Sequence, residues 1–191
     1  MTQEKWKSYL DMANQPDSLT SEDNRRRAEA LYFTVFATDG WDKTKKLLVL
    51  GCGDGYEVSL LKEAGWEDVK GITFYDGEYE NAKKMGFSGI VVQGDIHEMP
   101  FGDEEFDYII SKETLEHMIS PFIALCEVTR VMKKEARFVH YIPEGEAKQS
   151  DWYHYTCAPA WLWKDLMTKA GLNVSSVKTH IEQNCYEGYK I

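Results

Sequence analysis

The sequence predicts an α/β protein with a doubly wound, Rossmann-like sheet whose strands are mostly parallel. Apolar runs alternate with helix-compatible segments from residue 46 to the end. The first run, 46–50, is uninterrupted, as expected of a strand buried on both faces. It leads into glycines at 51, 53 and 55, and a helix-compatible segment follows at 56–64. A strand, a glycine turn and a helix in this order open a nucleotide-binding α/β unit.

Length and composition are those of one compact domain. The chain has 191 residues, of which 43% are hydrophobic, and this supports a sizeable core. Its net charge of −10 argues against nucleic acid or an anionic lipid surface as a partner. No apolar run approaches the roughly 20 residues that cross a membrane, and no apolar region of a secretory signal follows Met1. We therefore expect a cytoplasmic protein with no membrane or nucleic-acid partner, and the oligomeric state stays open.

The cysteines are scattered along the chain and form no C-x-x-C pair. They are Cys52, Cys126, Cys157 and Cys185. This spacing is typical of reduced thiols in a cytosolic protein. It does not predict a zinc site, and no metal is expected.

Residues 1–45 are predicted to form a short helical cap that packs with the main domain, residues 46–191, as one compact unit. The stretch 20–23 has the pattern of a capped helix start, and apolar residues follow at helical spacing as far as Phe36. Gly40 ends this cap.

The main domain is expected to contain about seven strands, the last one antiparallel, with helices on both faces of the sheet. The predicted strands are 46–50, 69–74, 89–93, 106–110, 136–142, 172–178 and 186–191. Asp76 is expected to cap a helix that stops at Gly86, and Ser120 to cap one whose first turn holds Pro121. A last helix begins near 156–159 and ends at Gly171.

Five loops are expected to meet in one pocket. Right-handed crossovers place the ligands of such a sheet beyond the carboxyl ends of its parallel strands. The loops after the first five strands therefore converge, and the glycine turn is the first of them.

The spacing of the glycines narrows the choice of ligand. A dinucleotide fingerprint, G-x-G-x-x-G, would place a glycine at position 56, where this chain has Tyr56. A dehydrogenase that uses NAD is therefore disfavoured. The observed G-x-G-x-G resembles motif I of the class I S-adenosylmethionine (SAM) dependent methyltransferases. A tight turn without any ligand is the alternative for this motif taken alone.

Residues 46–180 as a whole resemble a class I SAM-dependent methyltransferase, close to the small "methyltransferase domain 11" type. The matching pieces stand in the family's order over about 85 residues. They are 49–55 (V-L-G-C-G-D-G), 71–73 (G-I-T), 94–96 (G-D-I), 99–107 (M-P-F-G-D-E-E-F-D), 115–117 (L-E-H) and 127–134 (E-V-T-R-V-M-K-K).

The resemblance implies S-adenosyl-L-methionine as the cofactor. The glycine turn would pass under its amino-acid portion and ribose. Glu78 is a better candidate than Asp76 for binding the ribose hydroxyls. Asp95 is the candidate that would accept a hydrogen bond from the adenine amino group, and Ile96 would cover the adenine ring. The predicted cofactor-binding residues are Gly51, Cys52, Gly53, Asp54, Gly55, Tyr56, Thr73, Phe74, Glu78, Asp95, Ile96, His97 and Ser111.

Three positions depart from the family's pattern. Val49 stands where the family usually has an acid two residues before the first glycine. Thr73 replaces the usual ribose-binding acid, as in relatives that resemble cyclopropane-fatty-acid synthases and that also use a polar residue five positions on. The usual Lys-Pro-Gly-Gly turn before the fifth strand reads K-K-E-A at 133–136.

The expected reaction is the transfer of a methyl group to a small-molecule acceptor, with an oxygen or nitrogen nucleophile favoured over carbon. Such a nucleophile needs a proton acceptor. His117 and His154 are the predicted catalytic bases, with Glu116 and Tyr155 as second choices. The predicted substrate-binding residues are Glu113, Glu116, Trp152 and Tyr155.

Two other functions stay open at this point. A protein with the same fold that has lost catalysis and serves in binding or assembly is consistent with Val49 and Thr73. An aminopropyltransferase also carries an apolar residue before its glycine turn. It would need clustered acids after the fourth strand, and 111–114 (S-K-E-T) does not supply them.

Overall fold

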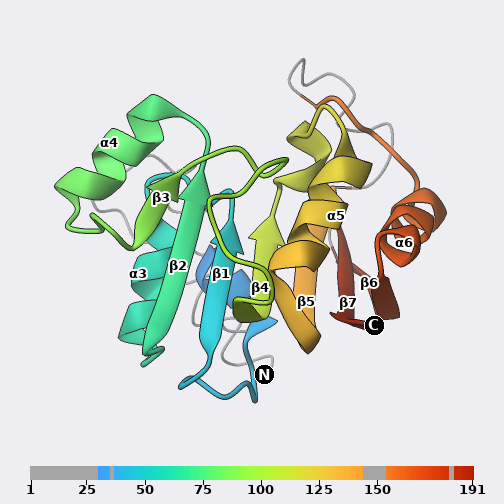
Figure 1. The fold of residues 1–191 in the computed structure, drawn as a ribbon, viewed down its shortest axis with the longest axis horizontal. Helices are drawn as coiled ribbons and strands as arrows, with labels where there is room; N and C mark the ends of the chain where they lie inside the picture. Colours follow the sequence, from blue (N-terminus) through green and yellow to red (C-terminus); the bar gives the residue numbers. More distant parts are fainter. Residues whose placement is uncertain (1–29, 35–36, 144–153, 181–182) are drawn as a thin grey trace.

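The computed structural model describes residues 30–34, 37–143, 154–180 and 183–191. These residues form one seven-stranded sheet with the strand order β3-β2-β1-β4-β5-β7-β6 (Figure 1). All neighbours pair in parallel except β7, which is antiparallel to both β5 and β6. The strands are β1 (Lys46–Leu50), β2 (Asp68–Thr73), β3 (Val91–Gln93), β4 (Phe106–Lys112), β5 (Met132–Pro143), β6 (Leu172–His180) and β7 (Gln183–Lys190). The predicted doubly wound sheet with one antiparallel strand at the end of the chain is confirmed.

The sheet reverses its direction of growth between β1 and β4. The chain first adds β2 and β3 on one side of β1, and then returns to place β4 and β5 on the other side. The carboxyl ends of β1, β2 and β4 point to the top of Figure 1. A ligand site of a doubly wound fold is expected above this reversal point.

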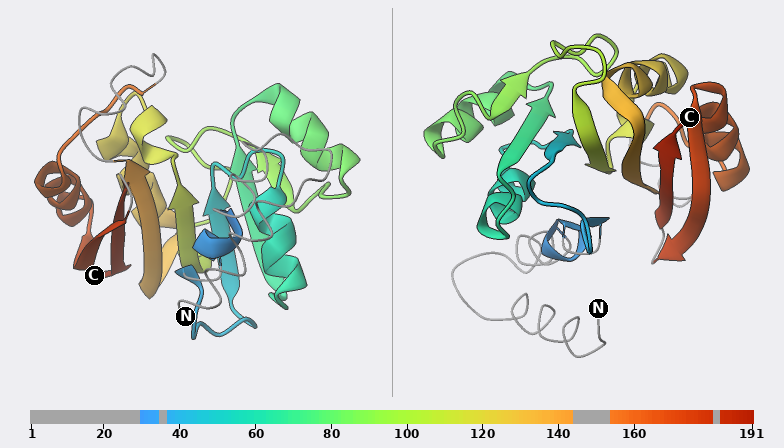
Figure 2. Two further views of the ribbon diagram at one scale, coloured as in Figure 1. Left: turned by 180° about the vertical axis from the view of Figure 1, so that it is seen from behind. Right: turned by 60° about the horizontal axis from the view of Figure 1, so that its bottom comes forward.

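Helices cover both faces of the sheet, as predicted (Figure 2). They are α3 (Tyr56–Glu63), α4 (Asp76–Lys84), α5 (Pro121–Val131) and α6 (Ala160–Lys169), with a short 3₁₀ helix, η1 (Leu115–His117), after β4. Because side chains of β1 alternate between faces, Leu48 and Leu50 join the core under α5 and α6, while Leu47 and Val49 join the core under α3 and α4.

Two helix starts differ from the sequence prediction. Helix α4 begins at Asp76 itself, with Tyr75 as the N-cap residue, so the expected cap by Asp76 is wrong. The carboxylate of Asp76 instead accepts a hydrogen bond from the side-chain amide of Gln93, the last residue of β3. Helix α5 begins with Pro121 after Ser120, as predicted, but the Ser120 hydroxyl makes no capping hydrogen bond.

The predicted N-terminal cap lies mostly outside the described residues. Residues 30–34 are helical, and Ala30 and Phe33 are buried. Phe33 meets the ring of Tyr141 on β5 edge to face, with centroids 4.7 Å apart. This segment therefore covers the sheet face that also carries α3. Among the described residues, no helix combines the length and the apolar character that a membrane span requires. All four cysteines are free thiols.

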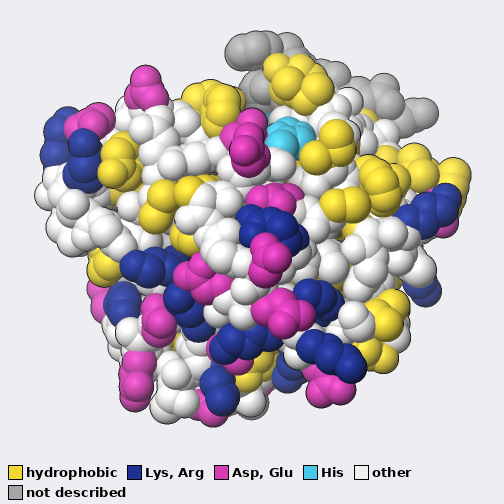
Figure 3. Space-filling view, viewed as in Figure 1, with side chains coloured by type: hydrophobic (Ala, Val, Ile, Leu, Met, Phe, Trp, Pro, Cys, Tyr) yellow, Lys and Arg dark blue, Asp and Glu magenta, His cyan; other side chains and the backbone are white. Residues whose placement is uncertain are grey.

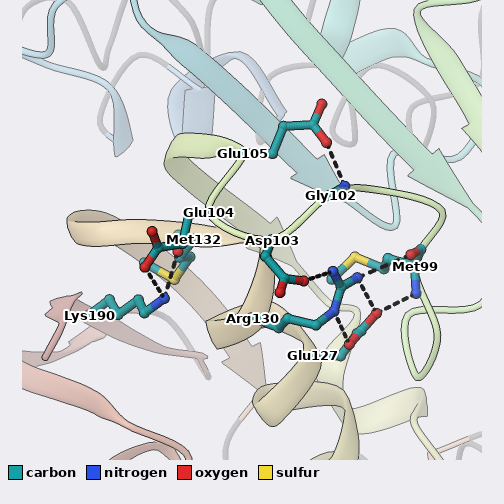
Figure 4. A network of polar contacts seen from close by, with 9 residues as sticks. All are labelled: Met99, Gly102, Asp103, Glu104, Glu105, Glu127, Arg130, Met132 and Lys190. Atoms are coloured by element: carbon teal, nitrogen blue, oxygen red, sulfur yellow. Dashed lines mark hydrogen bonds and ion pairs between the residues drawn. The ribbon is translucent and has the colours of Figure 1, made fainter.

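An ion-pair network ties the loop before β4 to α5 (Figure 4). The guanidinium of Arg130 bonds both carboxylate oxygens of Glu127, each at 2.7 Å, and one oxygen of Asp103 at 2.6 Å. Glu127 also accepts the backbone N–H of Met99 at 2.7 Å, and Arg130 donates to the Met99 carbonyl. Two of the segments that carry the family resemblance, 99–107 and 127–134, thus hold each other in place.

β5 contains a residue in a left-handed conformation that is not a glycine. Glu135 has φ 62°, and the pairing of β4 with β5 shifts its register between Phe106 and Tyr108. This is the position where the resembling family usually has glycine. The backbone conformation is therefore kept although Glu135 supplies a Cβ that disfavours it.

We expect Glu135→Gly to stabilise the fold by about 0.5–1 kcal/mol, because glycine removes the left-handed strain at some cost in chain entropy. Urea unfolding of the two proteins measures this difference. Lys134→Gly is the control: Lys134 does not have positive φ, so its replacement is expected to destabilise. A loss of stability in Glu135→Gly would contradict the interpretation.

Glu127→Ala is expected to cost about 2 kcal/mol, because it leaves the Met99 amide and the Arg130 fork without their carboxylate. Asp103 is 78% exposed in its side chain, so Asp103→Ala is expected to cost less than about 0.5 kcal/mol.

The hydrogen bonds of Arg130 lower the pKa of Glu127. The contribution of the Glu127 carboxylate to the free energy of unfolding is therefore complete above its unfolded-state pKa of about 4.3. This contribution is lost as the pH drops through the lower pKa of the folded state. Urea unfolding near pH 7 and near pH 4 checks this, and an equal cost at both would contradict it.

Candidate functional site

The glycine turn between β1 and α3 is shaped by what lies against it. Gly51, Gly53 and Gly55 all have positive φ, at 63°, 53° and 89°. A Cβ on Gly51 would come within 2.4 Å of the Thr114 hydroxyl oxygen, and one on Gly55 within 2.9 Å of the Phe87 ring. The turn therefore needs glycine at these positions, because the backbone is left-handed and because a Cβ at Gly51 or Gly55 would clash with neighbouring side chains. It delivers the N-terminus of α3, whose free N–H groups favour an anionic or polar ligand.

The predicted ribose contacts come together beside this turn. The buried hydroxyl of Thr73, at the end of β2, donates a hydrogen bond to the carboxylate of Glu78 in the first turn of α4. The same carboxylate lies 3.9 Å from where a Cβ of Gly53 would stand. An acceptor therefore faces the glycine turn, in the position where this fold binds ribose hydroxyls.

The loop after β3 presents Asp95 in a fixed orientation. One Asp95 oxygen accepts both the backbone N–H of His97, at 2.8 Å, and its ring Nδ1, at 2.6 Å. The other ring nitrogen, Nε2, accepts the amide of Ser120 at 3.2 Å. Partial burial raises the pKa of Asp95, but the two His97 bonds outweigh it and lower the pKa overall. Asp95 is thus held ionised, and His97 acts as its support. Ile96 is buried next to them, whereas Phe74 is 62% exposed.

Two predicted cofactor contacts point into the protein. The thiol of Cys52 packs against Gly71, where a Cβ would come within 2.5 Å of the sulfur. Burial raises the pKa of this thiol. Ser111 is fully buried, and its hydroxyl shares a 2.8 Å hydrogen bond with Nδ1 of His140. Burial lowers the pKa of His140 to about 3, so this imidazole is neutral. These side chains support the strands, and neither presents its polar group to a ligand.

The acidic support that the resembling family has at the position of Val49 is absent from β1. Val49 is buried in the core under α3. An acid does occur nearby, because Glu57 lies in the first turn of α3. Burial raises the pKa of Glu57, although its own backbone amide and Lys112 act to lower it. Sequence reasoning missed Glu57 and His140. The signal for Glu57 is an acid in the first turn after a glycine-rich loop.

The predicted catalytic residues form one cluster after β4 and β5. Nε2 of His117 lies 3.8 Å from Oε1 of Glu116, and the rings of His117 and His154 have centroids 4.7 Å apart. The backbone N–H of Thr156 donates to the carbonyl of Glu116 at 3.0 Å and so brings the later segment to η1. Glu116 is buried, and both histidines are partly exposed.

This cluster stands next to the glycine turn. Thr114, the residue before η1, packs against Gly51 and donates to the carbonyls of Leu50 and Lys112. Glu113 has φ 47°, a left-handed conformation that costs free energy and that clusters at functional sites. The predicted substrate contact Trp152 lies outside the described residues, and Tyr155 is 62% exposed.

Large apolar side chains are exposed around the cluster. Figure 3 shows hydrophobic side chains gathered at the upper right of this face, over α5 and α6, with mixed charges below. The exposed large apolar residues that follow η1 and His154 in the sequence are Ile119, Phe122, Ile123, Tyr155 and Trp161. They neighbour η1 and His154 along the chain. A ligand that enters here would meet apolar surface before it reaches the polar cluster.

The family model of the "Methyltransferase domain" matches residues 48–140. An O-methyltransferase of Penicillium expansum, cnsE, is 25% identical over 158 residues, or 73% of this chain and 57% of its own length. The chain therefore spans less than two thirds of that relative.

Two solved structures share the fold. One is in the complex between the Haloferax volcanii Trm112 methyltransferase activator and a methyltransferase, with a TM-score of 0.75 and 15% identity over 95% of this chain and 97% of that one. A SAM-dependent methyltransferase of Aquifex aeolicus has a TM-score of 0.64 and 19% identity over 77% and 82%. At these identities the structures support the fold alone.

Gly51→Ala is expected to cost at least about 2 kcal/mol, from left-handed strain plus the clash with Thr114. Gly65→Ala is the matched control, because Gly65 has φ 92° but nothing within 4 Å of an added Cβ. Its cost is expected to be about 1–2 kcal/mol, from strain alone. Urea unfolding of both, with Thr114→Ala combined with each, measures the coupling. Equal coupling of Thr114→Ala to both glycine variants would sink the steric argument.

Proposed function

The chain belongs to the class I SAM-dependent methyltransferases, and we propose that it transfers a methyl group to an oxygen of a small acceptor with an apolar body. The observation that carries this proposal is the cluster of Glu116, His117 and His154 beside the glycine turn. An oxygen nucleophile must lose a proton, and this cluster offers groups that can take one. The similarity to an O-methyltransferase and the exposed apolar side chains around the cluster support the same choice.

The residues present fit S-adenosylmethionine, the cofactor that the family implies. The glycine turn is open at Gly53, where the nearest atoms to an added Cβ would be those of the Glu78 carboxylate at 3.9 Å. Glu78, joined to Thr73, would accept the ribose hydroxyls. Asp95 would accept from the adenine amino group with the carboxylate oxygen that His97 does not bond. The bound cofactor supplies a methyl group on a sulfonium, which is a good leaving group.

The protein's part in such a reaction is positioning and exclusion of water. The loop of Thr114 fixes η1 against the glycine turn, so Glu116 and His117 face the side where an acceptor would approach. The carboxylate of Glu116 lies 3.8 Å from the imidazole of His117. We propose that His117 takes the proton of the acceptor hydroxyl, with His154 next to it.

Glu78→Gln is expected to weaken S-adenosylmethionine binding at least about tenfold, because charge-assisted hydrogen bonds to the ribose become neutral ones. Calorimetric titration with S-adenosylmethionine, its demethylated product and NAD measures this. Glu80→Gln is the control, since Glu80 pairs with Lys83 on the exposed side of α4. The parent protein is expected to bind the first two ligands at submillimolar concentrations and not to bind NAD.

A folded protein that binds neither S-adenosylmethionine nor its product would contradict the proposal. That result would favour the alternative of a binding or assembly protein with this fold. Val49 and Thr73, which depart from the family's pattern, keep this alternative open.

A further inference from the structure

Glu116, His117 and His154 have the composition of a metal-binding site. One ligand atom from each residue lies within 4.8 Å of the other two. Two imidazoles and one carboxylate are a ligand set of catalytic zinc sites, in which water or substrate takes the fourth position. We propose that this cluster binds a divalent transition-metal ion, with Zn²⁺ as the ion that fits its ligands best.

The spacing of the ligand atoms is close to what one ion requires. Two protein ligands of a tetrahedral Zn²⁺ lie about 3.4 Å apart, and two atoms at about 2.1 Å from one ion are never more than about 4.2 Å apart. The 3.8 Å between Glu116 Oε1 and His117 Nε2 is within that limit. It is also too long for a direct hydrogen bond. The remaining separations, at most 4.8 Å, exceed the spacing of a tetrahedral pair by up to about 1.4 Å, a shift that rotation of the partly exposed imidazole side chains can supply.

The scaffold holds the three ligands without the ion. Glu116 is fixed in η1 between the buried Leu115 and the amide of Thr156, which bonds its carbonyl. That bond lies two residues after His154, so it sets the position of the second imidazole. Glu116 is itself buried, with 2% of its side chain exposed. Carboxylates buried in this way often coordinate metal ions, so its position is compatible with a role as a ligand.

The ion would define the class of acceptor. This step rests on the proposed methyl transfer to oxygen and deepens it. A hydroxyl bound to Zn²⁺ has a strongly lowered pKa, so the acceptor's proton would pass to bulk water when its oxygen joins the ion. The new bond forms between that oxygen and the methyl carbon. The carbon–sulfur bond of the donor breaks and leaves its electron pair on sulfur. The acceptor is therefore an alcohol or phenol whose oxygen can ligate a metal. With the ion bound, the histidines would be its ligands and the ion would acidify the hydroxyl, whereas in the metal-free cluster they would be the proton acceptors.

Zinc binding by the full chain tests the site directly. The parent for this experiment carries Cys126→Ser and Cys157→Ser, because these exposed thiols could bind zinc by themselves. Titration with ZnCl₂ against a competing chromophoric chelator gives stoichiometry and affinity, and Co²⁺ gives a visible absorption spectrum that reports on coordination. We expect one equivalent of Zn²⁺, and an affinity at least roughly a hundredfold lower in Glu116→Gln and in His154→Ala, because each removes a direct ligand.

Matched controls separate this site from non-specific binding. Glu113→Gln changes an acid on the same loop that is not in the cluster, and zinc affinity is expected to stay within about twofold. His154→Ala lies on a partly exposed segment, so its folding can be verified by circular dichroism even if Glu116→Gln is destabilised. No stoichiometric zinc binding, or equal affinity in the parent and both cluster variants, overturns the proposal. S-adenosylmethionine binding measured on the same samples decides the methyltransferase proposal separately, because it depends on Glu78 and the glycine turn.

Discussion

The contact between Thr114 and the backbone of Gly51 is the constraint on which the site depends. The space that a Cβ of Gly51 would fill is taken by the Thr114 side chain, whose hydroxyl bonds the carbonyl that ends β1. The first and fourth loops of the sheet are therefore locked at their closest point. Because Thr114 directly precedes η1, this contact also fixes where Glu116 and His117 lie relative to the glycine turn. The cofactor side and the acceptor side of the site share this one junction.

The two sides are built by different kinds of contact. On the cofactor side, most partners are close in sequence: Thr73 bonds Glu78, and Asp95 bonds His97. On the acceptor side, the partners come from distant segments, as in the bond from Thr156 to Glu116. Local contacts form whenever their own turn forms, whereas the distant ones require the completed sheet. The acceptor side is thus the part whose geometry depends most on the fold as a whole.

This difference explains what the sequence could and could not predict. Apolar runs and glycines placed the strands, and the first one, 46–50, was predicted with its observed bounds, because a buried parallel strand has a local signature. The start of β5 was predicted too late, at 136 rather than Met132. The strand continues through the left-handed residue Glu135, and a glutamate, unlike a glycine, does not indicate that conformation in the sequence. The cap predicted for Asp76 was wrong because its partner, Gln93, is a residue of another strand.

Side-chain direction was the second limit on prediction from sequence. Cys52 and Ser111 occupy positions in the expected binding loops, but the first faces Gly71 and the second faces His140. A motif gives the position of a residue along the loop, while the packing of the opposite sheet face decides where its side chain points. The metal-binding role that we propose for Glu116, His117 and His154 was not part of the sequence prediction, which expected no metal. The cysteine pattern bears only on sites built from thiols, and His154 is far from η1 in sequence.

The charge of the cluster constrains the acceptor more than its shape does. Glu116 brings a buried carboxylate to the reacting end of the site, in a protein whose net charge is −10. As long as no metal ion occupies the cluster, an acceptor that presents a carboxylate or phosphate to this end would add a like charge, which costs roughly several kcal/mol. A hydroxyl can instead arrive as a neutral group and then release its proton to the cluster or to water. The apolar side chains around the entrance select in the same direction, because they favour an uncharged body. The apolar surface thus favours an alcohol or phenol over an anionic acceptor whether or not a metal ion occupies the cluster, and the carboxylate of Glu116 adds to this preference in the metal-free cluster.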